Sequence, residues 1–135
     1  MIYGAGCKGN FNALVSFAGK LPVFPKTYNA HFMIYIDNLS EFVRLMIDRE
    51  ETGVFCPQNC CVASTDEIVR LIARQHGKKI LIIPGFLWAL KLVGAVSPKA
   101  EKAFGSLCYD RRLSNYETEY CVVSLEESIA RTCSG

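Results

Sequence analysis

Hydrophobic and polar residues alternate near the middle of the chain in a way that predicts a short strand followed by an amphipathic helix. Residues 33–36 are apolar and favour a strand, and Asp37 and Asn38 follow them as candidate helix caps. Glu41 has the spacing of a capping-box partner for Asn38, in a helix that runs to about Glu50. The apolar positions have the spacing of one helical face: Leu39, Phe42, Val43, Met46 and Ile47.

Two further capping boxes predict where later helices begin. In residues 64–67, Ser-Thr-Asp-Glu opens a helix that runs to about His76 and is ended by Gly77. Its inward side chains are predicted to be Ile68, Leu71 and Ile72. In residues 124–127, Ser-Leu-Glu-Glu opens a last helix that runs to about Thr132.

The N-terminal part of the chain is predicted to contain a strand end, a short helix and an edge strand. Residues 1–3 are apolar and run into a glycine-rich turn, after which Asn10 is placed to cap a helix over 11–18. Residues 21–24 are apolar, but they contain one proline and are closed by another, which restricts them to an edge strand or an extended loop.

Further strands are predicted at 54–56 and 79–83, and further helices at 86–93 and 99–107. Strands and helices therefore alternate along most of the chain. This alternation favours the α/β fold class.

Composition narrows the class of protein. The chain has 135 residues, 50% of them hydrophobic, and a formal charge of +2 from 15 basic and 13 acidic side chains. This length suits one domain or a part of one. The nearly balanced charge argues against nucleic acid or an anionic membrane as the main partner. The longest apolar stretch, 80–96, is interrupted by Pro84, Gly85 and Lys91, so we interpret it as protein core and expect no membrane partner.

The seven cysteines do not have the spacing of a disulfide framework, and the first residues do not resemble a secretory leader. We therefore expect reduced thiols and a cytoplasmic location. Cys56, Cys60 and Cys61 form a cluster, but a structural zinc site needs four ligands, usually as two closely spaced pairs. No second pair follows at a suitable distance, so we expect no metal.

Three features remain as candidates for chemistry. Residues 4–9 match Gly-x-Gly-x-x-Gly, but the apolar run before them is short and the nearest acid is Asp37, so a plain glycine turn is favoured over a dinucleotide site. His31 is either a ligand-binding residue or a strand-end packing residue. Arg111 and Arg112 either bind phosphate or lie in a solvated turn. The chain contains no Tyr-x-x-x-Lys sequence.

Several segments, taken in order, resemble one enzyme family. They include Met-Ile-Tyr-Gly-Ala-Gly at 1–6 and His-Phe-Met-Ile-Tyr-Ile-Asp-Asn-Leu at 31–39. Shorter matches follow at 53–55, 64–68, 77–80 and 120–129. Together they resemble the extended short-chain dehydrogenases, which form the NAD-dependent epimerase/dehydratase family. The likeness is greatest to members that are similar to UDP-glucose 4-epimerase.

This resemblance implies the C-terminal, substrate-binding part of a Rossmann-type α/β enzyme, without the N-terminal Rossmann half. It implies one partial domain over 1–135, in which residues of about 1–6 and 32–56 belong with the edge of the cofactor domain. The catalytic residues and the NAD site would lie in the missing half, so NAD is expected in the full-length parent and not on this chain. Strand edges and an apolar helix face left bare by that half lead us to expect a homo-oligomer.

The resemblance also implies where a UDP-sugar would bind. Asn10 and Phe11 are similar in position to a helix start that contacts the diphosphate and the uracil. The helix start offers free backbone N–H groups to a phosphate. Pro22, Val23 and Phe24 correspond to an extended segment that packs along the uracil ring.

Two basic side chains complete the implied site. His31 takes the place of an arginine that the family commonly holds on the diphosphate, and Lys102 is the nearest basic candidate for a second phosphate contact. Histidine is mostly neutral at pH 7 unless a nearby anion raises its pKa. The alternative to an epimerase part is a non-catalytic nucleotide-binding or regulatory module of the same fold, or part of a nucleotide-sugar dehydratase or reductase.

Overall fold

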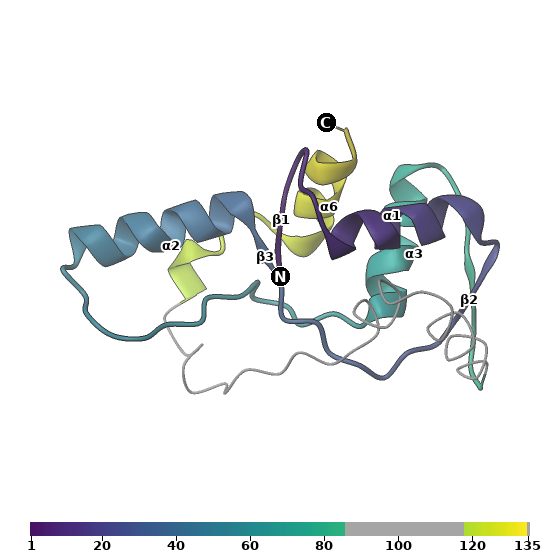
Figure 1. Ribbon diagram of the computed structural model, residues 1–135, viewed down its shortest axis with the longest axis horizontal. Coiled ribbons are helices and arrows are strands. Elements are labelled where there is room, and N and C mark those ends of the chain that lie inside the picture. Colours follow the sequence, from purple (N-terminus) through teal and green to yellow (C-terminus); the bar gives the residue numbers. More distant parts are fainter. Residues whose placement is uncertain (86–117, 135) are drawn as a thin grey trace.

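The computed structural model describes residues 1–85 and 118–134, which form a mixed α/β arrangement of four α-helices and short parallel strands (Figure 1). The elements in order are β1 (Ile2–Tyr3), α1 (Asn10–Lys20), β2 (Val23–Pro25), β3 (Ile34–Tyr35), α2 (Ile36–Asp48), α3 (Thr65–Gln75), β4 (Leu81–Ile83), the 3-10 helix η2 (Thr118–Tyr120) and α6 (Leu125–Ser134). The helices predicted at 86–93 and 99–107 lie outside the described residues. None of the described helices is long and apolar enough to cross a lipid bilayer.

The strands form two parallel pairs. β1 pairs with β3, so that Ile2 lies opposite Ile34, and β2 pairs with β4, so that Phe24 lies opposite Ile82. The prediction of a strand at 54–56 is wrong, because these residues pair with no strand in the described part of the chain. Phe55 instead packs edge-on against the ring of Phe42, with 5.9 Å between the ring centroids.

The larger hydrophobic core lies where α1, α3 and α6 pack together beside β1 (Figure 1). Ile68 and Ile72 of α3 are fully buried there, as predicted, while Leu71 is half-buried. We call this set the large core: Tyr3, Phe11, Leu14, Ala18, Phe24, Met33, Tyr35, Ala63, Ile68, Val69, Ile72, Ala73, Val123 and Ile129.

A second, smaller core lies under α2, which extends away from the other helices in Figure 1. This small core consists of Ile34, Phe42, Leu45 and Tyr120. The predicted apolar face of α2 is only partly right. Phe42 is buried, but Val43 is 48% exposed and Ile47 is 70% exposed. The buried side of α2 instead contains Asn38, Phe42 and Leu45. On this side the Asn38 side chain donates to the Val123 carbonyl at 3.0 Å and accepts from the Val123 N–H at 2.9 Å.

The predicted capping box is confirmed at α3 and is wrong at α2. At α3 the Glu67 carboxylate accepts hydrogen bonds from the Ser64 backbone N–H at 2.8 Å and from its hydroxyl at 2.9 Å, which confirms the capping box. Gly77 follows α3 with φ +67°, a conformation that favours glycine. The Asn38–Glu41 capping box is wrong: α2 begins at Ile36 without a side-chain cap, and Glu41 instead pairs with Arg44 at 2.7 Å.

The other two helix starts are closer to expectation. Before α6, the Ser124 hydroxyl accepts a hydrogen bond from the Glu127 backbone N–H at 3.3 Å, and the helix begins at Leu125 as predicted. α1 begins at Asn10 itself, so this side chain does not cap the helix. The residue before it, Gly9, has φ +146°, which allows the chain to turn sharply into α1.

Candidate functional site

The start of α1 has features that suit an anion. A turn closed by a hydrogen bond from the Cys7 N–H to the Gly4 carbonyl, at 3.1 Å, leads through Gly9 into the helix. The first turn of α1 contains no acidic residue, and the exposed Lys8 lies just before it. The positive end of the helix dipole therefore meets no carboxylate on the first turn of α1. The Asn12 N–H in this turn is already bound to the Gly9 carbonyl at 3.2 Å.

The two predicted aromatic residues lie in the large core rather than on the surface. Phe11 is stacked on Tyr3, with ring centroids 5.0 Å apart and planes inclined by 14°. Phe24 is fully buried and its ring centroid lies 6.4 Å from that of Phe17. Their side chains hold α1 and β2 in place. Of the other residues of the predicted uracil segment, Pro22 is exposed and Val23 is half-buried.

His31 is buried and is bound to the segment that leads into α3. Its backbone N–H donates to the Ala63 carbonyl at 3.0 Å. Its ring Nε2 lies 2.7 Å from the Thr65 hydroxyl and 3.1 Å from the side-chain amide of Asn29. The structure thus gives His31 a packing role between two segments, and its contact with a diphosphate stays a prediction.

Asp66 and Thr27 extend the same polar cluster. The Thr27 hydroxyl and backbone N–H donate to the Asp66 carboxylate at 2.6 and 3.1 Å, and the hydroxyl also accepts from the Asp66 backbone N–H at 3.1 Å. Burial alone would raise the pKa of Asp66. Hydrogen bonds from Thr27, from Ser64 and from backbone N–H groups outweigh burial and lower that pKa below its usual value.

We call the five residues the α3 entry cluster: Thr27, Asn29, His31, Thr65 and Asp66. Sequence reasoning assigned Asp66 to the helix cap and did not identify the partners in the 27–31 segment. The available signal was weak, because the pairs are separated by 34 to 39 positions in the chain.

The predicted residues are therefore only partly brought together. Asn10 and Phe11 lie at one end of α1, Pro22 to Phe24 follow its other end, and His31 lies beside α3. Lys102, Arg111 and Arg112 lie outside the described residues. In residues 1–85 and 118–134, no group of three or more His, Cys, Asp or Glu side chains is placed to hold a metal ion.

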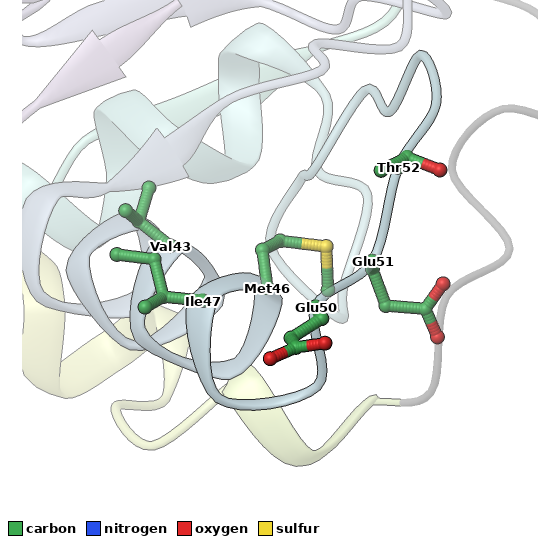
Figure 2. A pocket seen from close by; sticks show the side chains of 6 residues that line it. All are labelled: Val43, Met46, Ile47, Glu50, Glu51 and Thr52. Atoms are coloured by element: carbon green, nitrogen blue, oxygen red, sulfur yellow. The ribbon is translucent and has the colours of Figure 1, made fainter.

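Two surface hollows lie elsewhere, and the predicted substrate residues line neither. One, of about 440 Å³, lies at the C-terminal end of α2 and is lined by Val43, Met46, Ile47, Glu50, Glu51 and Thr52 (Figure 2). The other, of about 390 Å³, lies against α3 and is lined by residues of three segments.

The cysteines correct one expectation. Cys60 and Cys121 form a disulfide, whereas all of the thiols were expected to be reduced. Cys7, Cys56, Cys61 and Cys133 are free, and Cys108 lies outside the described residues. The pairing joins positions 61 residues apart, and such connectivity does not follow from spacing alone.

Comparison with known proteins does not assign the chain to a family. No protein-family model, no curated protein and no solved structure matches the chain significantly.

Proposed function

We propose that this chain is the C-terminal, substrate-binding part of an NAD-dependent nucleotide-sugar epimerase similar to UDP-glucose 4-epimerase. The observation that carries the proposal is the parallel pairing of β1 with β3. Parallel strands are normally members of larger sheets that are covered on both faces. A pair of two-residue strands is too short to be stable by itself.

The exposure of β1 indicates where further sheet would attach. Ile2 is 58% exposed, although Ile34 opposite it is buried. The outer edge of β3 is occupied by Asn59, whose backbone N–H donates to the Met33 carbonyl at 2.8 Å and whose side-chain oxygen accepts from the Tyr35 N–H at 3.0 Å. Among the described strands, β1 therefore has the open edge of the pair. The cofactor domain of such an enzyme would supply the next parallel strand there, which agrees with the assignment of residues 1–6 and 32–56 to the edge of that domain.

The exposed apolar face of α2 supports the same proposal. Ile36, Val43 and Ile47 are exposed along one side of this helix, and we call them the α2 stripe. The stripe begins beside the end of β1, since a Cβ added at Gly4 would lie 2.7 Å from Cγ2 of Ile36. A cofactor domain attached at β1 would therefore lie next to uncovered apolar surface.

In this proposal a UDP-sugar binds with its diphosphate at the start of α1, near Lys8 and Asn10, and with its uracil along Pro22 and Val23. His31 and Lys102 are the further basic candidates. NAD bound to the other half of the parent enzyme would take a hydride from a sugar carbon and return it. This chain contributes binding and orientation, and a cytoplasmic location belongs to the same proposal.

Calorimetric titration of the whole chain with UDP tests the proposal. We expect UDP to bind, and Lys8→Glu to weaken binding about tenfold, because it reverses a charge beside the helix start. Arg70→Glu, at an exposed position of α3 in a hollow that none of the proposed UDP contacts lines, is the matched control and leaves the affinity unchanged. Absence of UDP binding at millimolar concentration, or equal effects of the two variants, would contradict the proposal. Titration with NAD is expected to give no binding.

His31→Ala separates the two roles of that histidine. If the ring contacts the diphosphate, the variant weakens UDP binding by about 1–2 kcal/mol, as for a charge-assisted hydrogen bond. Binding by the unmodified chain then strengthens as the pH falls from about 8 to 6. A variant that loses folding stability but keeps its UDP affinity and pH dependence assigns His31 to the α3 entry cluster alone.

A further inference from the structure

The hollow against α3 is a groove with two walls that come from distant parts of the sequence. Its floor is the exposed side of α3, including Arg70, Leu71 and Arg74. One wall consists of residues 61–63, and the other consists of residues 124–126 at the start of α6. We call this feature the α3 groove.

A disulfide joins the chain segments that form the two walls. Cys60 directly precedes the first wall, and Cys121 lies three residues before the second. The Cα atoms of the two cysteines are 6.2 Å apart. Cys60 is exposed and Cys121 is half-buried, so a reducing thiol can approach from the Cys60 side.

The first wall is held at both of its ends. Before it, the Asn59 backbone N–H donates to the Met33 carbonyl at 2.8 Å, and the Asn59 side chain binds Tyr3 and Tyr35. At its last residue, the Ala63 carbonyl accepts from the His31 N–H at 3.0 Å. Residues 60–62 between these anchors are all exposed, and the disulfide is a covalent bond from Cys60 to the segment that leads into the other wall.

We propose that the Cys60–Cys121 disulfide is a reversible latch between the two chain segments that carry the walls of the α3 groove, and that its reduction loosens residues 60–62 and widens the groove without unfolding the protein. Other contacts of the segment that contains Cys121 do not depend on the disulfide. The Tyr120 hydroxyl donates to the Gln58 carbonyl at 2.8 Å, and Asn38 binds the backbone of Val123 at 2.9 and 3.0 Å. These bonds keep the second wall in place after reduction.

The other cysteines favour a latch over a permanent covalent tie. Cys56 and Cys61 remain as free thiols beside Cys60 in the sequence, and Cys133 remains as a free thiol within α6. Free thiols persist in reducing surroundings, and a disulfide that is accessible to solvent there is of the labile, regulatory type. The latch is thus expected to respond to the thiol–disulfide balance around the protein.

The reductant in this step is a dithiol. One of its thiolates attacks Sγ of Cys60, the bond to Sγ of Cys121 breaks, and Cys121 leaves as a thiolate that takes up a proton. The second thiol of the reductant then attacks the mixed disulfide and releases Cys60, which is also protonated. The dithiol is oxidised to a disulfide by two electrons, and the two cysteines are reduced.

Methyl NMR of the whole chain, before and after treatment with dithiothreitol without denaturant, tests the latch. We expect the methyl resonances of Val62 and Leu125, which line the two walls, to shift on reduction and to return after removal of the dithiol and reoxidation. The methyl resonances of Leu14, in the large core, should not move. Peptide mapping after alkylation should show that Cys60 and Cys121 have become reactive together.

Variants supply the controls. Cys60→Ser should resemble the reduced protein and should not respond to dithiothreitol, and Cys121→Ser provides the same comparison from the other side. Cys56→Ser keeps the latch and should behave as the unmodified chain. The proposal is overturned if the disulfide is reduced only in denaturant, if reduction also shifts the Leu14 resonances, or if Val62 and Leu125 do not respond to reduction.

Discussion

The region around α3 and the region around α2 solve the same problem of burying an amphipathic helix in different ways. α3 lies between α1 and α6, and its inward residues Ile68, Val69 and Ile72 are completely buried in the large core. α2 buries Phe42 and Leu45 in the small core and leaves Val43 and Ile47 in solvent. Hydrophobic patterning was clear in both helices, so the difference comes from the surroundings and not from the helix sequence.

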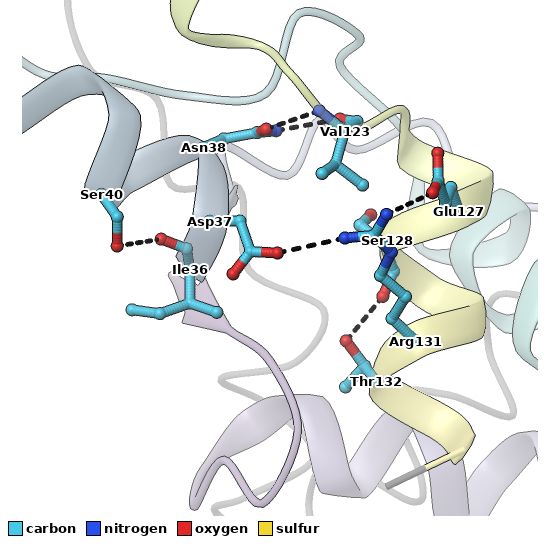
Figure 3. A network of polar contacts seen from close by, with 9 residues as sticks. All are labelled: Ile36, Asp37, Asn38, Ser40, Val123, Glu127, Ser128, Arg131 and Thr132. Carbon is cyan, nitrogen blue, oxygen red and sulfur yellow. Dashed lines mark hydrogen bonds and ion pairs between the residues drawn. The ribbon is translucent and has the colours of Figure 1, made fainter. Parts of the chain in front are cut away.

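α2 lacks a second layer of apolar side chains over its exposed face. Polar contacts at its two ends attach it to the rest of the protein instead. At its start, Asn38 binds the backbone of Val123, and Asp37 accepts from Arg131 of α6 at 3.3 Å (Figure 3). Just after its end, Arg49 pairs with Glu119 at 2.6 Å. Exposed ion pairs contribute little to stability, so the Asn38 contact is the strongest of these attachments.

One substitution in each helix should give the largest difference in the free energy of unfolding between the two regions. Ile72→Ala removes a buried side chain of the large core and should lower the free energy of unfolding by about 2–5 kcal/mol. Ile47→Ala removes an exposed side chain of α2 and should change it by less than about 0.5 kcal/mol. Urea unfolding followed by circular dichroism measures both. Equal losses would mean that α2 is covered in solution.

Asn38→Ala tests the polar attachment of α2. The change leaves a buried N–H and carbonyl of Val123 without their partner, and we expect a loss of about 2 kcal/mol. Asn12→Ala is the matched control, because Asn12 donates to the Cys7 carbonyl at 2.8 Å on an exposed part of α1. Its loss should be below about 0.5 kcal/mol in the same measurement.

Sequence reasoning succeeded for contacts between residues close in sequence and failed for contacts between distant ones. Local signals were reliable where partners lie close in sequence: the Ser64–Glu67 box, Gly77 and the start of α6 are confirmed. Asn38 was wrongly assigned as a cap because its real partner, Val123, is 85 residues away. The Cys60–Cys121 bond was missed for the same reason.

The predicted site was limited by a different cause. The spacing and resemblance identified positions along the chain, but Phe11 and Phe24 satisfy a core requirement that looks the same in sequence as an aromatic ligand face. The partners of His31 in the α3 entry cluster could not be deduced, since Asn29 and Thr65 are common polar residues without a motif. The position of Lys102 is outside the described residues.

The pH dependence of the free energy of unfolding tests the contribution of the polar residues around α3. The folded-state pKa of Asp66 is lowered, so its carboxylate contributes stability above the unfolded value of about 3.9 and loses it as the pH falls through the folded pKa. Asp66→Asn should cost about 1 kcal/mol at pH 7 and should flatten the acid limb of the stability curve. An identical acid limb in variant and unmodified protein would show that the Asp66 carboxylate does not contribute to the pH dependence of stability.

A substitution in the α2 stripe should have the smallest effect on folding, and it tests directly whether the stripe promotes self-association. Exposed apolar surface and the open edge of β1 lead us to expect oligomers at micromolar concentration. Ile47→Lys should shift sedimentation toward the monomer without changing unfolding. Ser16→Lys, at an exposed position of α1, should leave the sedimentation profile as it is. A monomeric unmodified chain would contradict the expectation of a homo-oligomer.

The place of α6 in the large core has a consequence for how the protein is made. The hydroxyl of Tyr3 lies 2.5 Å from that of Ser128, and Ile129 is fully buried, so the ends of the described chain meet inside the fold. During synthesis the N-terminal part emerges from the ribosome first, at about 5–20 residues per second. The surface of α1 and α3 that α6 covers therefore stays exposed to solvent for several seconds until α6 has been synthesised. We expect chaperones that bind nascent chains to bind this apolar surface.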